Sequence, residues 1–222
     1  MKPRELLGTA RVPQGDELRL FRRGGDFMVV TGRNELMNSR MSGSEEALAT
    51  MTAERLGGHP APHLLIGGYG MGFTLRAALA VLGRNARITV AELVPEIIDW
   101  ARGPMAELTA GCLDDRRVDL VVADVAQVMR SSRAGFDAIL LDVDNGPDGL
   151  IRAANDRLYS RPGLATAKAA LKPGGILAIW SAAPDPAFRR RLAEAGFQVK
   201  EATVRARSNG KGARHMIWFA RN

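Results

Sequence analysis

The chain has 222 residues, of which 46% are hydrophobic, and it carries a formal net charge of +7. This length and composition are sufficient for one main α/β domain with a full core and a small appendage. A single cysteine, Cys112, excludes an internal disulfide, and the three histidines show no zinc-binding spacing. No apolar run approaches the ~20 residues of a membrane span or forms a signal-peptide core, so we expect a metal-free, cytoplasmic protein without membrane contact.

The first part of the chain predicts a small β-rich segment. Residues 17–21 and 27–30 flank a glycine-containing turn and are typical of a hairpin. Residues 42–45 resemble a capping box, which opens a helix that ends at Gly57 and Gly58. We therefore expect a hairpin and helix segment over residues 1–58 and a Rossmann-like catalytic domain over residues 59–222.

A glycine loop follows the next predicted strand. The apolar residues 64–66 lead into a glycine-rich stretch, and a helical pattern resumes at residue 73. Glycine permits positive φ and a close approach to a ligand, while a helix start offers unpaired N–H groups. The loop therefore predicts a site for a nucleotide-like cofactor, although glycine turns also join strands to helices for packing reasons. Two places suit Tyr69 equally well: it lies against the ligand, or it packs under the N-terminal segment. The residues that we assign to this loop are Gly67, Gly68, Tyr69, Gly70 and Gly72.

Two acids stand at the ends of the following strands. Glu92 closes the strand predicted over residues 86–91, about 20 positions after Gly72, which suits a carboxylate that binds ribose hydroxyls. Asp124 follows the strand predicted over residues 118–123. It caps the next helix, binds an adenine amino group, or does both.

A cluster of carboxylates follows the fourth strand. Residues 136–141 form a nearly continuous apolar run, as expected for a parallel strand covered on both faces. Asp142 and Asp144 come next and share a face if the chain stays extended. Carboxylates there could hold a cationic amine and accept its proton as it attacks an electrophilic carbon. We assign Asp142 to this role and Asp148 to helix capping, and leave Asp144 open between the two.

The remaining elements complete the expected fold. Trp180 ends a fifth strand near the ligand edge, where we expect a core tryptophan with a satisfied N–H. Two closing strands follow, around residues 197–204 and 215–220. The fold class is a doubly wound, Rossmann-like, mostly parallel sheet with an antiparallel C-terminal hairpin, preceded by the small β-rich segment.

The net charge raises the question of a nucleic-acid partner. The densest basic cluster lies on the closing hairpin, but no aromatic residues are interleaved with it as base stacking requires. A solvated face or a site for a small acidic substrate is the favoured interpretation. The cluster comprises Arg205, Arg207, Lys211, Arg214 and His215.

Several stretches together resemble the spermidine synthase, or polyamine aminopropyltransferase, family. The resemblance covers most of the chain and implies a small β-domain before a Rossmann domain of the S-adenosylmethionine methyltransferase type. It also implies transfer of an aminopropyl group from decarboxylated S-adenosylmethionine to an amine. The stretches that carry it are residues 34–41, 44–47, 59–60, 66–68, 91–93 and 141–147.

The resemblance also implies individual roles. Glu92 matches the acid that binds the ribose, Asp124 the acid that binds adenine, and Asp142 the catalytic acid. Asp144 matches an acid of the gate loop, and Gln14 matches a glutamine that contacts the cofactor.

The sequence departs from the family pattern in three places. Gly70 stands where an acid usually holds the ammonium end of the aminopropyl chain, Ser44 and Glu45 replace a Tyr-Gln pair at the amine pocket, and residues 204–209 lack an expected tyrosine. Without this acid, the glycine N–H groups and the helix start are suited to bind the carboxylate of intact S-adenosylmethionine. We therefore expect an S-adenosylmethionine-type transferase that alkylates a small-molecule amine, with methyl transfer favoured and aminopropyl transfer as the alternative. A second alternative is a non-catalytic basic RNA-interacting module. The acceptor and the oligomeric state, including a homodimer, stay open.

Overall fold

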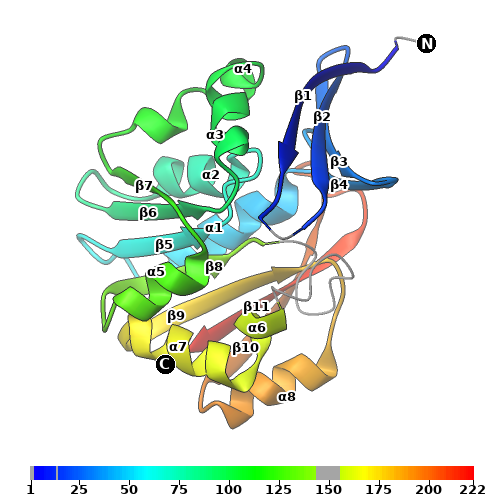
Figure 1. Ribbon diagram of the computed structural model, residues 1–222. Coiled ribbons are helices and arrows are strands. Elements are labelled where there is room, and N and C mark those ends of the chain that lie inside the picture. Colours follow the sequence, from blue (N-terminus) through cyan, green and yellow to red (C-terminus); the bar gives the residue numbers. More distant parts are fainter. Residues whose placement is uncertain (1–2, 14, 144–155) are drawn as a thin grey trace.

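The computed structural model describes residues 3–13, 15–143 and 156–222, and it contains two β-sheets (Figure 1). The N-terminal sheet is antiparallel, with the strand order β1-β2-β3-β4. The hairpin predicted over residues 17–30 is its β2–β3 pair. Its strands are β1 (Glu5–Arg11), β2 (Glu17–Arg23), β3 (Asp26–Thr31) and β4 (Asn34–Asn38).

The second sheet has seven strands in the order β10-β11-β9-β8-β5-β6-β7. The strands from β9 to β7 are parallel, and β11 runs antiparallel to both β9 and β10. The predicted fold class is confirmed, including the C-terminal hairpin. The strands are β5 (His63–Gly67), β6 (Arg87–Glu92), β7 (Val118–Val122), β8 (Phe136–Leu141), β9 (Leu171–Ser181), β10 (Gln198–Arg205) and β11 (Arg214–Arg221).

Helices cover both faces of this sheet (Figure 1). On one face lie α1 (Gly43–Arg55), α2 (Phe73–Val81), α3 (Pro95–Arg102) and α4 (Ala106–Thr109), with the 3-10 turn η1 (Cys112–Asp114). On the other face lie α5 (Val125–Ser131), α6 (Asp156–Tyr159), α7 (Arg161–Ala170) and α8 (Pro186–Glu194). None of these helices has both the length and the apolar character that crossing a membrane requires.

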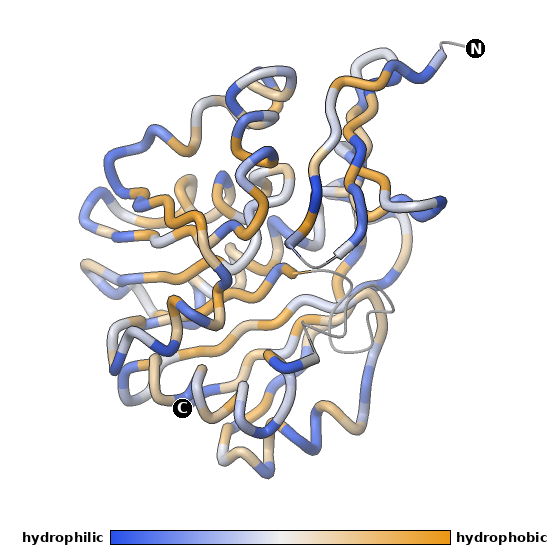
Figure 2. Tube along the Cα trace, in the orientation of Figure 1, coloured by the Kyte–Doolittle hydropathy of each residue, from blue (hydrophilic) through white to orange (hydrophobic). Residues whose placement is uncertain are grey.

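The central strands supply both hydrophobic cores because successive side chains point to opposite faces. Leu64 and Ile66 of β5 pack with α1, α2 and α3, whereas Leu65 packs with α5, α7 and α8. Figure 2 shows the resulting hydrophobic run along the central strands. Burial on both faces explains why residues 136–141 read as a continuous apolar stretch.

The N-terminal sheet and α1 contact the larger sheet and its other helices through different elements. Gly8 of β1 lies so close to Trp100 of α3 that a Cβ there would be 2.5 Å from the indole nitrogen. α1 packs against α2 and β9, although the sequence analysis groups it with the N-terminal segment. The boundary between residues 58 and 59 stays a prediction.

The capping box predicted at residues 42–45 is wrong. The side chain of Ser42 makes no capping hydrogen bond at the start of α1. Instead, the hydroxyl of Ser44 donates to the carboxylate of Glu45, its neighbour in the first helical turn. The Ser-Gly-Ser-Glu pattern opens the helix, but its polar side chains serve other contacts.

Candidate active site

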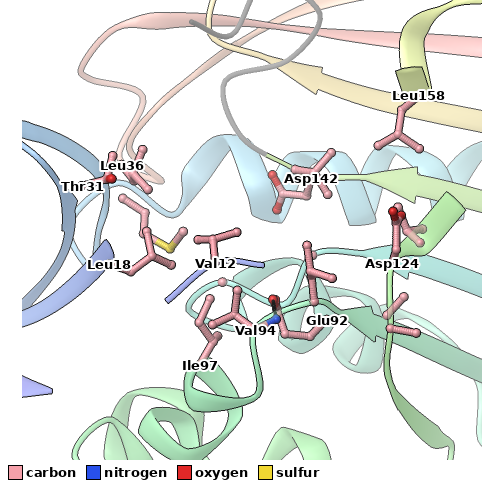
Figure 3. A pocket seen from close by; sticks show the side chains of 18 of the residues that line it. Val12, Leu18, Thr31, Leu36, Glu92, Val94, Ile97, Asp124, Asp142 and Leu158 are labelled. Atoms are coloured by element: carbon pink, nitrogen blue, oxygen red, sulfur yellow. Dashed lines mark hydrogen bonds between the residues drawn. The ribbon is translucent and has the colours of Figure 1, made fainter. Parts of the chain in front are cut away.

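Two adjoining pockets lie at the carboxyl edge of the large sheet. The large pocket, of about 150 Å³, is bounded by residues that follow β5, β6, β7 and β8 and by apolar residues of the N-terminal sheet (Figure 3). The small pocket, of about 90 Å³, extends toward α1 and β9. In doubly wound sheets ligands bind outside the strand ends where the strand order reverses, and here that point lies between β5 and β8.

Glu92 is buried at the end of β6 and lines the large pocket. Its two carboxylate oxygens accept backbone N–H bonds from Tyr69 and Val94, at 2.8 and 2.9 Å. Burial raises the pKa of this carboxyl, and the backbone donors oppose the increase. Glu92 therefore ties the glycine loop to β6, and the backbone N–H groups of Leu93 and Gly70 also favour its ionised form.

Asp124 follows β7 and lines the large pocket on the side away from Thr31 and Leu36 (Figure 3). Its Oδ1 accepts the N–H of Ala126 at 2.8 Å, so it caps α5 as predicted. The residue is exposed, and its side chain lines the pocket while it caps. The capping role is confirmed, and the adenine-binding role stays a prediction.

The glycine loop divides into two kinds of position. Gly68 and Gly70 line the large pocket with positive φ angles of 87° and 56°. Gly67 and Gly72 are needed for packing, because a Cβ at these positions would lie 2.8 Å from Val125 and 2.7 Å from the Tyr69 hydroxyl. Of the four glycines predicted to bind the cofactor, the large pocket therefore includes Gly68 and Gly70.

Tyr69 packs into the core rather than against the large pocket. The residue is 4% exposed, and its hydroxyl lies 3.4 Å from the Sγ of Cys112. Its backbone N–H contributes to the site through the bond to Glu92. Of the two alternatives for Tyr69, the structure favours packing, although the residue borders the small pocket.

Asp142 stands where the two pockets meet. It follows β8 and lines both of them, as do Leu36, Met37 and Gly70. The Thr74 hydroxyl, in the first turn of α2, donates to Asp142 Oδ2 at 2.6 Å. Burial raises the pKa of this carboxyl to about 6, and the hydrogen bond from Thr74 limits the increase. The predicted catalytic acid is thus held at the junction of the pockets.

Glu45 brings a second carboxylate to the small pocket, from the first turn of α1. Burial, followed by repulsion from Asp142, raises the pKa of Glu45 to about 8. Within the described part of the chain, neither carboxylate forms an ion pair with a lysine, arginine or histidine. These two carboxyl groups are half-buried, and without a cation the raised pKa keeps Glu45 protonated at neutral pH. A positively charged group that binds beside them favours the ionised form of both, so together they provide a site for a cation.

Two polar groups at the pockets lack partners among the described residues: Thr31 Oγ1 and Trp180 Nε1. Thr31 is buried and lines the large pocket. Trp180 is 8% exposed and lines the small pocket. The expectation of a satisfied tryptophan N–H is therefore wrong, because β9 places the indole beside a cavity rather than beside a protein acceptor.

Some predicted residues lie outside the described residues, namely Gln14, Asp144 and Asp148. The described residues contain no group of three or more histidine, cysteine, aspartate or glutamate side chains placed to hold a metal ion. Sequence patterns alone do not indicate that Thr74 and Thr31 line or support the site, or that Glu45 contributes a carboxyl group to it. For Glu45 a signal existed, because it stands where the resembling family carries its amine-pocket pair.

Comparisons with known proteins agree with this geometry. The model of the spermine/spermidine synthase domain matches residues 43–194. A polyamine aminopropyltransferase of Mycobacterium tuberculosis strain H37Rv is 32% identical over 183 residues, which cover 81% of this chain and 31% of that protein. Putrescine N-methyltransferase 4 of Nicotiana tabacum is 36% identical over 125 residues, which cover 55% of this chain and 30% of that protein. This chain thus spans about a third of the length of these relatives.

A solved structure, the spermidine synthase from Thermotoga maritima, superposes with a TM-score of 0.76. It is 19% identical, and the match covers 97% of this chain and 72% of that one. At this identity the likeness establishes the shared fold. The family match over residues 43–194 goes further: this chain belongs to the spermine/spermidine synthase family.

Proposed function

We propose that this chain transfers an aminopropyl group from decarboxylated S-adenosylmethionine to a small-molecule amine. The observation that carries the proposal is the position of Asp142, which lines both pockets and is accompanied by Glu45 in the small one. In this arrangement the large pocket binds the donor and the small pocket binds the accepting amine. Asp142 lies between them, where the transferred group must pass.

The residues of the large pocket fit the donor. Glu92 lines the pocket with a carboxyl group that suits ribose hydroxyls, Asp124 faces the pocket beside α5, and the unpartnered Thr31 hydroxyl offers a further polar contact. The remaining lining is mostly apolar, as is common for pockets that hold an adenosine-sized ligand. When bound, the donor supplies a carbon that a sulfonium sulfur has activated toward nucleophiles.

The residues around the small pocket fit an amine. An amine enters as an ammonium ion, and its nitrogen becomes a nucleophile only after it loses a proton. Asp142 has a raised pKa close to neutrality, which suits a general base that accepts this proton. Its hydrogen bond to Thr74 holds the carboxylate in one orientation at the pocket junction.

The methyl transfer favoured in the sequence analysis lacks support from the comparisons, which fit the aminopropyl alternative better. A physical reason is available. Intact S-adenosylmethionine would bring its carboxylate toward Gly70 and Asp142, close to Glu45, where like charges repel. The ammonium of the decarboxylated donor would be attracted there, so the acid missing from the glycine loop is replaced by carboxylates of other elements.

The experiment compares the two donors. Calorimetry should give at least about tenfold tighter binding of the decarboxylated donor, and mass spectrometry of reactions with putrescine or 1,3-diaminopropane should detect an aminopropylated amine. Tighter binding of intact S-adenosylmethionine together with a methylated amine would replace the proposal by methyl transfer. That outcome has a precedent in the name of the Nicotiana tabacum relative.

A further inference from the structure

A hydrogen-bonded chain links the small pocket to the C-terminal hairpin. His215 Nδ1 in β11 lies 2.9 Å from Ser44 Oγ, and the Ser44 hydroxyl donates to Glu45 Oε2 at 2.8 Å. Ser44 is fully buried, so its hydroxyl is shielded from bulk water. His215 and Ser44 are 171 positions apart in the sequence, and packing of the hairpin against α1 brings them together.

The donors and acceptors in this series of hydrogen bonds follow from the number of hydrogens that each group carries. A serine hydroxyl has one hydrogen, and here it is given to Glu45. His215 Nδ1 must therefore carry the hydrogen of its own bond to Ser44. Burial lowers the pKa of His215, which favours the neutral ring, and the bond to Ser44 then places its single hydrogen on Nδ1. His215 thus donates a hydrogen bond to Ser44, and Ser44 donates one to the Glu45 carboxylate.

The indole of Trp180 fixes the imidazole ring. The two rings make an edge contact, with centroids 4.8 Å apart and planes inclined at 76°. Trp180 also lines the small pocket, and its N–H has no acceptor among the described residues. Three elements, α1, β9 and β11, therefore meet behind the carboxylate of Glu45.

We propose that Ser44 and His215 are positioning residues that hold Glu45 toward the small pocket, where Glu45 and Asp142 together bind the ammonium group of the accepting amine. This inference rests on the proposed function. The charged groups that face Glu45 are Asp142 and Glu46, and no cation among the described residues offsets them. The ammonium supplies the missing positive charge, and its presence lowers the raised pKa of Glu45 so that both carboxyl groups are ionised when the amine is bound.

The proton and electron pairs balance in the reaction that follows. The ammonium gives one proton to the Asp142 carboxylate, and the freed nitrogen lone pair forms a bond to the donor carbon. The bond between that carbon and the sulfonium sulfur breaks, and its electron pair stays on sulfur. The product is a secondary ammonium ion and a neutral thioether, and Asp142 later releases its proton to solvent.

The first test removes the charge of Glu45. In Glu45→Gln, the KM for putrescine should rise about 10- to 100-fold, as expected for the loss of a charge-assisted hydrogen bond. The matched control is Glu46→Gln, which makes the same change one position along α1 outside both pockets. Equal KM values for the two variants would overturn the role of Glu45.

The second test separates hydrogen bonding from packing at His215. His215→Asn retains an N–H near the place of Nδ1 but loses the ring contact with Trp180, whereas His215→Phe retains a ring and loses the donor. We expect the KM for putrescine to rise about tenfold in His215→Phe and to stay closer to wild type in His215→Asn. The reverse order would show that His215 acts by packing alone.

Direct binding distinguishes failure of this inference from failure of the proposed function. Calorimetry of putrescine with wild type and Glu45→Gln needs no turnover. If the amine binds with this dependence on Glu45 but no aminopropylated product forms with either donor, the proposed function fails and the amine site stands. If wild type is active and Glu45→Gln binds putrescine equally well, the inference fails and the proposed function stands.

Discussion

Asp142 combines two properties that suit a general base. It lies where the two pockets join, and burial raises its pKa to about 6, so that it is ionised but not inert as a proton acceptor at neutral pH. The Thr74 hydroxyl fixes its orientation without neutralising it. These properties come from the fold, because an aspartate exposed after a strand would keep an ordinary pKa.

Replacing Asp142 tests this assignment. Asp142→Asn preserves the shape of the side chain and removes the proton acceptor, so we expect turnover to fall about 10²- to 10⁴-fold while donor binding persists. Turnover is measured by mass spectrometry of the product, and donor binding by calorimetry. A variant with wild-type turnover would exclude Asp142 as the base.

Glu45 gives a second residue-scale prediction, on stability against pH. Its pKa is about 8 in the folded protein and 4.5 ordinarily, so the folded state holds a proton that the unfolded state releases between these values. The free energy of unfolding should therefore decrease as pH rises from about 4.5 to about 8. Glu45→Gln removes this loss and should be more stable than wild type at pH 9, by roughly 1–3 kcal/mol.

Thermal unfolding at two pH values measures this effect. For a chain of this size, each kcal/mol corresponds to roughly 2–4 °C in Tm. The gain should be small at pH 4.5, where the carboxyl is protonated in the folded state and half-protonated in the unfolded state. A Tm difference of the same size at pH 4.5 and pH 9 would contradict the assignment. The expected opposition between higher stability and weaker amine binding is common at functional sites.

At the scale of elements, two glycines in the loop between β5 and α2 differ in how well they tolerate a side chain. A Cβ at Gly68 would lie 2.5 Å from the Asp142 carbonyl oxygen, which belongs to backbone that cannot move aside. A Cβ at Gly70 would meet first the sulfur of Met37, at 3.4 Å, and that side chain is flexible. The left-handed conformation at Gly70 is one that aspartate adopts more readily than most residues.

This difference predicts opposite results for two substitutions. Gly70→Asp should fold and bind the decarboxylated donor more tightly, by about tenfold, because it adds a carboxylate beside the ammonium end. Gly68→Ala should weaken the binding of both donors, because it displaces the backbone at Asp142, directly after β8. Calorimetry with each donor provides the comparison. Weaker binding of the decarboxylated donor to a folded Gly70→Asp would show that its ammonium lies elsewhere.

For the whole molecule, the decisive feature is that two sheets enclose one pocket. β6, β7 and β8 deliver Glu92, Asp124 and Asp142, and the N-terminal sheet covers them with residues such as Leu18 and Thr31 (Figure 3). The hydroxyl of Thr31 is buried without a partner among the described residues, which is unfavourable until a ligand supplies one.

Thr31→Val tests whether this hydroxyl serves the ligand. Removing an unsatisfied buried hydroxyl should stabilise the ligand-free protein by roughly 1 kcal/mol and weaken donor binding by a few fold. Thermal unfolding with and without donor separates the two effects. If the variant is stabilised equally in both conditions, the hydroxyl makes no contact with the donor.

The net charge of +7 also belongs to the whole molecule. In the closing hairpin, Arg205 donates to the carbonyl of Gly212, and His215 points inward to Ser44. The basic cluster therefore does not act as one uniform face. The RNA-binding alternative stays a prediction, for which steeply salt-dependent RNA binding without donor affinity would be the supporting result.

The sequence by itself was sufficient for features that depend on neighbouring residues. The parallel strands, the glycine loop and the acids Glu92, Asp124 and Asp142 stand at junctions between a strand and a helix, where short-range patterns are informative. It could not show which glycines face the ligand and which allow packing, because that depends on Val125 and Tyr69 contacting the loop from other segments.

Tertiary structure alone decided how distant residues share one site. α1 brings Glu45 beside Asp142, β11 brings His215 to Ser44, and β9 leaves the Trp180 N–H beside a cavity. The pKa values of the two carboxylates follow from this packing, since burial and mutual repulsion arise only when separate elements meet. The loop without an acid at Gly70 pointed to methyl transfer as long as it was considered by itself. With Glu45 in place, the same site gains a carboxylate that the local sequence of the loop does not contain.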